Sequence, residues 1–174
     1  MKNNGFTLIE LVMIIILLGI VSAVAIPRFW DMINPSKENV TKHRMEELRK
    51  SIVGNPDMTG AGTLSARGFR GDTGLWPIQL SDLVTQPANG LNDTGASSSV
   101  SNWNRYTRKG WNGPYVDSSG TPPAYSIDAW GNNFTYRSPT TCNPPVIISN
   151  GTDGILNTAG CIKSGDDIVV ELRY

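Results

Sequence analysis

The chain has 174 residues, 39% of them hydrophobic, and its 15 Lys and Arg residues balance its 15 Asp and Glu residues. This length suffices for one small domain beside one apolar segment, which argues against two large domains. Because the charges balance, no global field attracts nucleic acid or acidic substrates, and we expect nucleic acid to be an unlikely partner.

The N-terminal region contains a long apolar run. Residues 11–26 read LVMIIILLGIVSAVAI and include no charged side chain. A helix from Phe6 to Ile26 would rise about 30 Å at about 1.5 Å per residue, which matches the hydrocarbon core of a bilayer. Lys2 precedes this run and predicts a cytoplasmic leader with the polar bulk across the membrane. We therefore predict a single-pass membrane helix.

Glu10 stands at the start of this apolar run. An ionised carboxylate in hydrocarbon has no water to solvate it, so an acid within a membrane helix is a candidate functional residue. The sequence therefore predicts a partner for Glu10.

Residues 5–10, which read GFTLIE, resemble the class III signal of type IV pilins and type II secretion pseudopilins. The resemblance implies that a prepilin peptidase cuts between Gly5 and Phe6 and N-methylates the new amine of Phe6. It also implies that Glu10 pairs with the N-terminal amine of an adjacent subunit. Two charges that are each costly in lipid become tolerable when paired. The other interpretation is an ordinary signal anchor that carries an isolated acid.

A second helix is predicted from Lys37 to Val53, after a break at residues 34–36. Apolar positions recur at helical spacing and form a stripe suited to covering a sheet. The stripe consists of Thr41, Met45, Leu48 and Ile52. Gly54 follows the last of these positions and predicts the end of the helix.

The rest of the chain is rich in Gly and Pro and lacks long apolar runs, which predicts a loop-rich domain with short strands. A short helix is expected around Leu80–Val84, and residues 89–101 are expected to form a surface loop. The β-branched and aromatic segments predicted as antiparallel strands are residues 114–116, 133–136, 146–148 and 168–170.

These elements predict an α+β fold in which a long N-terminal helix continues into an amphipathic spine that packs on a small antiparallel sheet, as in pilins. The predicted divisions are a cleaved leader (1–5), a transmembrane and polymerisation helix (6–27), the spine (28–54) and a head domain (55–174) with a C-terminal loop (142–161).

Three later segments resemble the ordered motifs of major pseudopilins: WNGPY at residues 111–115, DAWGNNFTY at 128–136 and GTDG at 151–154. The resemblance implies calcium in the C-terminal loop, held by hard carboxylate and carbonyl oxygens. The implied ligands are the side chains of Asp153 and of Asp166 or Asp167, with the carbonyls of Ser149 and Ile155. The alternative is that these are solvated acids in turns.

Cys142 and Cys161 are the only two cysteines, and both lie on the predicted extracytoplasmic side. This placement favours a disulfide over a metal or redox site. Such a C-terminal disulfide loop resembles type IV pilins more than typical major pseudopilins, so the two types of filament, pseudopilus and surface pilus, both stay open.

The segment 103–111 interleaves basic and aromatic side chains, a pattern found in proteins that bind single strands or glycans. These residues are Trp103, Arg105, Tyr106, Arg108, Lys109 and Trp111. The preferred interpretation is a surface loop with its aromatic side chains folded inward, because the neutral charge balance supplies no supporting field. The alternative is a minor or tip pilin that binds DNA or a surface ligand.

No catalytic constellation is recognisable, so we expect a structural protein and no enzyme. We expect a subunit of a type IV pilus-like filament, with further copies and minor pilins or pseudopilins, the prepilin peptidase and the inner-membrane assembly platform as partners. Before assembly it would lie in the bacterial inner membrane with a periplasmic C-terminal domain, and afterwards in a periplasmic pseudopilus or a surface pilus.

Overall fold

The computed structural model describes residues 6–55 and 67–173, without the side chains of residues 24–32. The predicted leader, with Gly5, and residues 56–66 of the predicted head lie outside the described residues. The chain forms two compact units, Met1–Lys37 and Glu38–Tyr174, which are described separately below.

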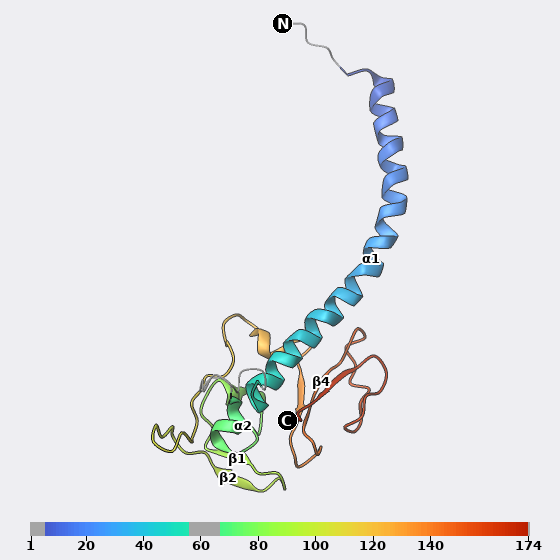
Figure 1. Cartoon of the computed structure of the whole chain (residues 1–174). Coiled ribbons are helices and arrows are strands. Elements are labelled where there is room, and N and C mark those ends of the chain that lie inside the picture. Colours follow the sequence, from blue (N-terminus) through green and yellow to red (C-terminus); the bar gives the residue numbers. More distant parts are fainter. Residues whose placement is uncertain (1–5, 56–66, 174) are drawn as a thin grey trace, which may run out of the picture. The chain divides into compact units, whose positions relative to one another are not determined.

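Helix α1 extends over Leu8–Val53, a length of 46 residues (Figure 1). The predicted break at residues 34–36 is wrong, because the helix continues through Pro35. A single proline removes one backbone donor, whereas the residues around it keep their own helical hydrogen bonds. The predicted end is confirmed, since the Gly54 N–H donates to the Lys50 carbonyl at 2.8 Å and Gly54 has φ of 103°.

The first unit exposes apolar side chains along the described part of α1. The exposed large hydrophobic residues there include Phe6, Leu8, Ile9, Leu11, Met13, Ile15, Leu17, Ile20 and Val21. Among the described residues, no helix combines the length and the apolar character needed to span a bilayer.

The second unit is built around the C-terminal part of α1, and the predicted stripe is confirmed. Thr41, Met45 and Ile52 are 0% exposed, and Leu48 is 2% exposed. The three apolar members pack in one core with side chains from the short helices and strands of this unit. Those side chains include Phe69, Trp76, Leu83, Phe134, Ile147 and Leu172.

Besides α1, the part of the chain that the structure describes contains three short helices: α2 (Gly68–Thr73), η3 (Leu80–Leu83) and η4 (Ala124–Ser126). The predicted helix near Leu80 is confirmed as the 3₁₀ helix η3. Helix α2 was not expected, because its sequence GFRGDT holds two glycines and has low helix propensity. Its position is fixed by tertiary packing instead, since Phe69 is fully buried.

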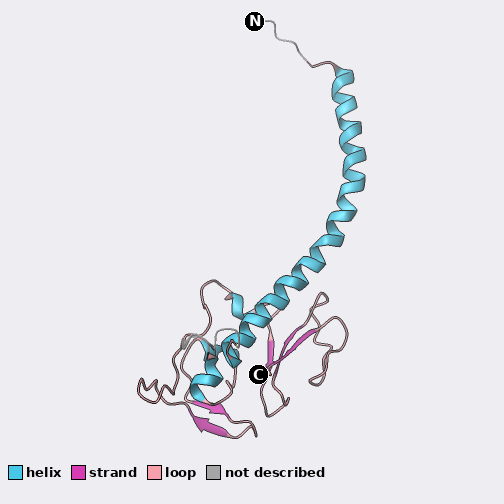
Figure 2. Cartoon of the chain, in the orientation of Figure 1, coloured by secondary structure: helices cyan, strands magenta, loops and turns pink. Residues whose placement is uncertain are grey.

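In the described ranges, five strands form two antiparallel sheets (Figure 2). Strand β1 (Asn89–Leu91) pairs with β2 (Ser97–Ser99). The other sheet has the order β3 (Thr135–Arg137), β4 (Val146–Ser149) and β5 (Ile168–Glu171). Central strand β4 is buried throughout, with Ile147 opposite both Tyr136 and Val170. Three of the predicted strands are therefore confirmed.

Two expectations for this unit are wrong. Residues 114–116 form no strand, because Pro114 lacks a ladder donor and the Tyr115 ring packs edge-on against Phe69 and Trp111. Residues 89–101 contain the β1–β2 hairpin in place of an irregular loop. Leu91 there exchanges two backbone hydrogen bonds with Trp76, which ties the hairpin to the core.

Candidate functional site

The N-terminal end of α1 carries the predicted processing and assembly residues. Phe6 is 76% exposed, and Thr7 directly precedes the helix. The Thr7 hydroxyl accepts from the Glu10 N–H at 3.4 Å and donates to Glu10 Oε2 at 3.5 Å. Thr7 and Glu10 have the Thr-x-x-Glu spacing of a helix capping box. Glu10 therefore has a local structural role that the sequence reasoning missed, although this spacing signals it.

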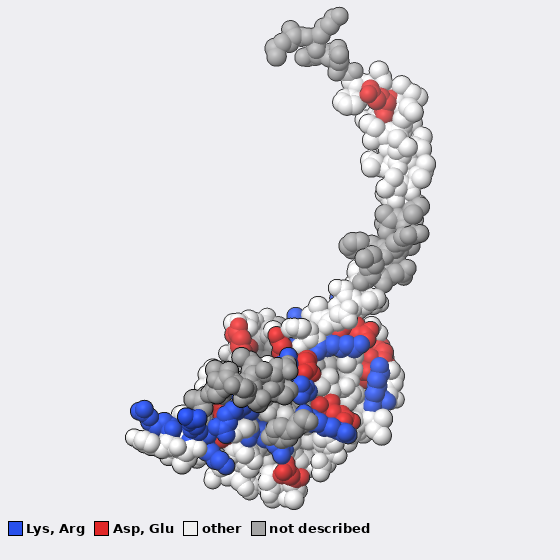
Figure 3. Space-filling view, in the orientation of Figure 1, with Lys and Arg blue, Asp and Glu red and all other residues white. Residues whose placement is uncertain are grey.

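Glu10 is also the one charged residue between positions 6 and 23. The side chains that surround it along the helix are exposed and apolar. Figure 3 shows this segment mostly in white, the colour of residues other than Lys, Arg, Asp and Glu. An apolar surface of this extent signals contact with a membrane or another protein.

The C-terminal loop, residues 142–161, is fastened at several points. Cys142 and Cys161 form a disulfide, as the cysteine pattern predicts. The Arg137 guanidinium on β3 donates to the carbonyls of Thr158 and Ala159, both at 2.9 Å. A guanidinium has several donors in a planar arrangement, which suits it to collecting successive backbone carbonyls.

Asp166 lies outside this loop and holds the turn at residues 152–153 within it. Its Oδ2 accepts from the Thr152 N–H and hydroxyl, both at 2.6 Å, and from the Asp153 N–H at 3.1 Å. These hydrogen bonds stabilise the ionised carboxylate, the Thr152 hydroxyl most, and lower the pKa of Asp166 to about 2.

The structure brings three of the five predicted calcium ligands together. Asp153 Oδ2, the Ile155 carbonyl and Asp166 Oδ1 lie 3.1, 3.2 and 3.5 Å from one atom, Nδ2 of Asn157. Hard oxygens around one point are the donors that calcium prefers, but an amide nitrogen lies at that point. A cation there would have to displace the Asn157 amide.

The side chains of the other two predicted ligand residues form hydrogen bonds elsewhere, although the predicted ligand atom of Ser149 is its carbonyl. Asp167 is buried, and its Oδ2 accepts from the Thr158 N–H at 2.6 Å. The Ser149 hydroxyl donates to Asp128 Oδ2 at 2.8 Å. Within the described residues, no three His, Cys, Asp or Glu side chains are grouped to hold a metal ion.

Asp128 is a buried carboxylate on which several segments meet. Its Oδ1 accepts from the backbone N–H groups of Trp130 and Asn132, at 2.9 and 2.8 Å, and its Oδ2 accepts from Ser149. Its carbonyl accepts from Arg44 of α1 at 3.0 Å. The DAWGNNFTY motif is thus a turn that joins α1 to β4. Sequence reasoning identified the motif but missed the role of its first residue.

The segment 103–111 divides between the core and the surface. Trp111 packs inward, and its indole N–H donates to the Asp82 carbonyl at 3.1 Å. Tyr106 is 89% exposed, so the expectation that the aromatic side chains fold inward is wrong for this residue. A loop has no sequence period that separates buried from exposed residues. The sequence therefore contained no signal for the outward position of Tyr106.

Two family models match the chain. The prokaryotic N-terminal methylation motif covers residues 1–26, and the model for protein G of the type II secretion system (T2SS) covers residues 69–168. The chain belongs to the type II secretion system protein G family. Its members are pseudopilins, a structural family and not a family of enzymes.

Named relatives agree with this assignment. The chain is 30% identical over 150 residues to type II secretion system core protein G of Xanthomonas campestris pv. campestris. These residues make up 86% of this chain and 79% of that protein. The protein of the same name from Pseudomonas aeruginosa is 27% identical over 158 residues, 88% of this chain and 86% of the relative.

A pilin is also similar to the chain. The type IV narrow pilus major component PilA5 of Thermus thermophilus is 30% identical over 103 residues, which cover 59% of this chain and 71% of the pilin. No solved structure matches the chain. This protein G family member is therefore a structural subunit of a type IV pilus-like filament, with the α+β fold that the sequence predicts.

Proposed function

We propose that this chain is a pseudopilus subunit that is stored in the inner membrane, with its head in the periplasm, and is drawn from there into the filament. A prepilin peptidase cuts between Gly5 and Phe6 and methylates the new amine of Phe6. Membership of the protein G family supports the pseudopilus over a surface pilus, and the match to the methylation motif over residues 1–26 supports the processing.

The single observation that carries the assembly step is the isolation of Glu10 on an exposed apolar helix. After cleavage, the Phe6 amine of one subunit is a cation at the end of this apolar surface, and the Glu10 carboxylate of a neighbour is its counter-charge. Pairing removes two unfavourable charges from the apolar phase, and packing of the exposed apolar side chains between helices then holds the subunits together. Minor pseudopilins and the inner-membrane assembly platform are the further partners.

This proposal is tested by comparing Glu10→Ala with Glu47→Ala in cells that assemble filaments. Glu47 is an exposed acid on the second-unit part of α1 and serves as the matched control. We expect both variants to be cleaved before Phe6 and methylated, as read by mass spectrometry of the N-terminus. Only Glu10→Ala should lose sheared filaments. Normal assembly of Glu10→Ala would refute the pairing, and an uncut wild-type N-terminus would refute the processing.

We also propose that the C-terminal loop binds calcium after the Asn157 amide turns aside. Asp153, Asp166 and the Ile155 carbonyl would then hold the ion, which would link Asp166 to the C-terminal loop. The convergence of these three oxygens on one point supports the proposal.

Thermal unfolding of the full chain in calcium, in magnesium and in a chelator tests the calcium proposal. Calcium alone should raise the unfolding midpoint, and Asn157→Ala should increase that rise because no amide has to be displaced. Asp117→Ala, in an exposed turn elsewhere, should leave the response unchanged. Equal midpoints in all three conditions would exclude calcium as a ligand.

A further inference from the structure

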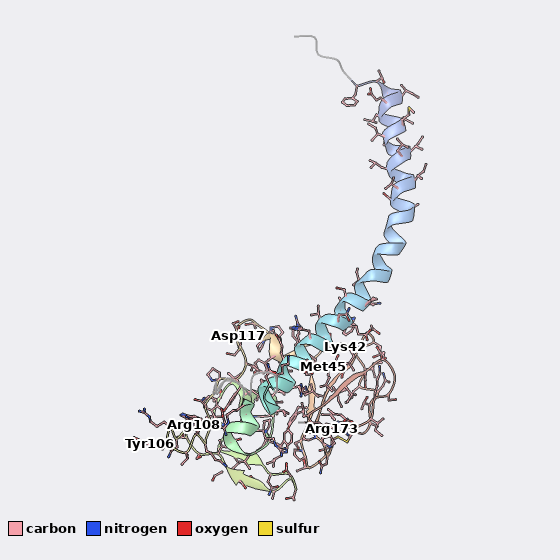
Figure 4. All side chains as sticks on the ribbon, in the orientation of Figure 1. Lys42, Met45, Tyr106, Arg108, Asp117 and Arg173 are labelled. Atoms are coloured by element: carbon pink, nitrogen blue, oxygen red, sulfur yellow. A yellow bond between two sulfur atoms is a disulfide. The ribbon has the colours of Figure 1, made fainter. Side chains whose placement is uncertain are left out.

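The second unit carries a projecting turn, residues 104–109, which we call the basic tip. It displays Arg105, Tyr106, Arg108 and Lys109, all of them exposed. Figure 4 shows Tyr106 and Arg108 pointing away from the rest of this unit, and blue atoms gather over the same projection in Figure 3.

The backbone of the basic tip is held in one conformation. Asn104 exchanges backbone hydrogen bonds of 2.8 Å with Lys109 and Arg108. The Asn104 side-chain carbonyl accepts from the N–H groups of Tyr106 and Thr107, at 2.9 and 3.2 Å. Asparagine side chains commonly stabilise turns in this way. The tip is therefore ordered before any ligand arrives, which lowers the entropic cost of binding.

The base of the tip is anchored in the core. Gly110 donates to the Asp72 carbonyl at 2.9 Å, and Arg67 donates to the Arg108 carbonyl at 2.9 Å. A side chain on Gly110 would collide with the backbone of Asn102, with a closest approach of 2.2 Å. The chain thus holds the exposed cations on a fixed support.

The basic tip carries a local excess of positive charge. Among the described residues, no carboxylate forms an ion pair with Arg105, Arg108 or Lys109. The sequence contains no Asp or Glu between Asp93 and Asp117. Three positive charges on a chain whose net charge is zero therefore form a local field, which the overall charge balance conceals.

Arg108 adopts φ of 52°, which is uncommon for a residue with a large side chain. Arg105 lies over the Tyr106 ring, with its guanidinium carbon 5.7 Å from the ring centroid. The second face of an 89% exposed ring stays open to a further planar group. The tip therefore combines an exposed aromatic ring with three exposed cations.

These features fit a flexible polyanion better than a protein surface. A stable protein interface buries about 800 Å² on each partner around an apolar centre, whereas Tyr106 is the only apolar body that the tip offers. Proteins that bind single strands combine cations along the backbone with aromatic rings under the bases. We propose that the basic tip binds single-stranded nucleic acid, with the three cations on phosphates and Tyr106 under one base.

The test measures fluorescence anisotropy of a labelled oligothymidylate with the full chain in neutral detergent, over a range of salt concentrations. Each phosphate contact contributes about 0.7 to the slope of log affinity against log salt for single strands, so three cations predict a slope of about −2. The variant Arg105→Ser, Arg108→Gly, Lys109→Ser should bring the slope near zero. Glycine at 108 keeps the positive φ, so the turn should survive.

Two further variants separate charge from stacking and from nonspecific effects. Tyr106→Ala should weaken binding about tenfold or more at unchanged slope, because one stacked base is lost. A control that removes three exposed cations elsewhere, Lys42→Ser, Lys163→Ser and Arg173→Ser, should bind like the wild type. Circular dichroism of each variant verifies that the fold is retained.

Three outcomes would overturn the proposal. The first is the absence of binding at the lowest salt concentration. The second is an equal loss of affinity in the control and in the tip variant. The third is competition by polyphosphate or heparin together with no effect of Tyr106→Ala, which would assign the tip to anionic polymers without bases.

Discussion

The two units of this molecule differ in how they treat the apolar side chains of α1, although this one helix belongs to both. In the second unit, α1 covers its apolar stripe with strands and short helices of the same chain, and Met45 is fully buried. In the first unit, the described apolar side chains are exposed, and Leu17 is 60% exposed. The second unit therefore holds a core of its own, whereas the exposed apolar surface of the first unit is of the kind that contacts a membrane or another protein.

The largest effect should come from Asp128→Ala in the second unit. The substitution leaves the part-buried N–H groups of Trp130 and Asn132 and the buried Ser149 hydroxyl without this acceptor, at about 1–3 kcal/mol for each group. We expect a loss of about 4 kcal/mol or more in the free energy of unfolding, measured by denaturant titration. The control Asp117→Ala changes an exposed acid and should have little effect. Equal losses in both variants would show that Asp128 does not organise this unit.

A matched pair of leucines tests the comparison directly within α1. Leu48→Ala opens a cavity beneath a side chain that is 2% exposed and should cost about 2–5 kcal/mol. Leu17→Ala should leave the stability of the second unit unchanged and reduce the yield of sheared filaments. The comparison fails if Leu17→Ala lowers the denaturant midpoint of the second unit as much as Leu48→Ala does.

Removal of the disulfide should produce the next effect. The chain-entropy model gives about 3 kcal/mol for closing a loop with a sequence separation of 19. The double variant Cys142→Ser and Cys161→Ser should therefore lower the free energy of unfolding by about that amount, and reduction of the wild type should do the same. A reductant that also destabilises the double variant would point to a cause other than the bond.

The smallest effect should be the acid sensitivity of Asp166. Its folded-state pKa of about 2 is below the value of about 3.9 in unfolded chains, so its stabilising contribution is complete above pH 4 to 5. The contribution is lost as the pH falls from about 4 to 2. Asp166→Asn should flatten this part of the stability profile, as measured by thermal unfolding against pH. Parallel profiles for the two proteins would contradict this assignment.

Sequence periodicity predicted the buried face of a helix, but it could not predict contacts between segments that are far apart in the sequence. The spacing of Thr41, Met45 and Leu48 identified the buried face of α1, because helical geometry places these positions together. The break at Pro35 was wrong, since a breaker rule considers only local hydrogen bonds. Asp128 binds the local N–H groups of Trp130 and Asn132, but no local pattern could assign its contact with Ser149, which is 21 residues away.

The candidate sites show the same division. Two cysteines sufficed to predict one disulfide, whereas the assembly role that the GFTLIE motif assigns to Glu10 stays a prediction. The predicted calcium set was only partly brought together, because the Asn157 amide and the backbone around Thr158 supply donors that a motif comparison does not include.

The contacts that hold the C-terminal loop differ in their response to acid. The Arg137 guanidinium stays protonated at every pH at which a protein stays folded, and the carbonyls of Thr158 and Ala159 do not titrate. These hydrogen bonds therefore do not depend on pH. Acid instead weakens the hydrogen bonds that Asp166 accepts from Thr152 and Asp153 in the middle of the loop, and it leaves the two ends of the loop joined by the disulfide. On return to neutral pH, the middle of the loop would reform between two ends that had stayed together.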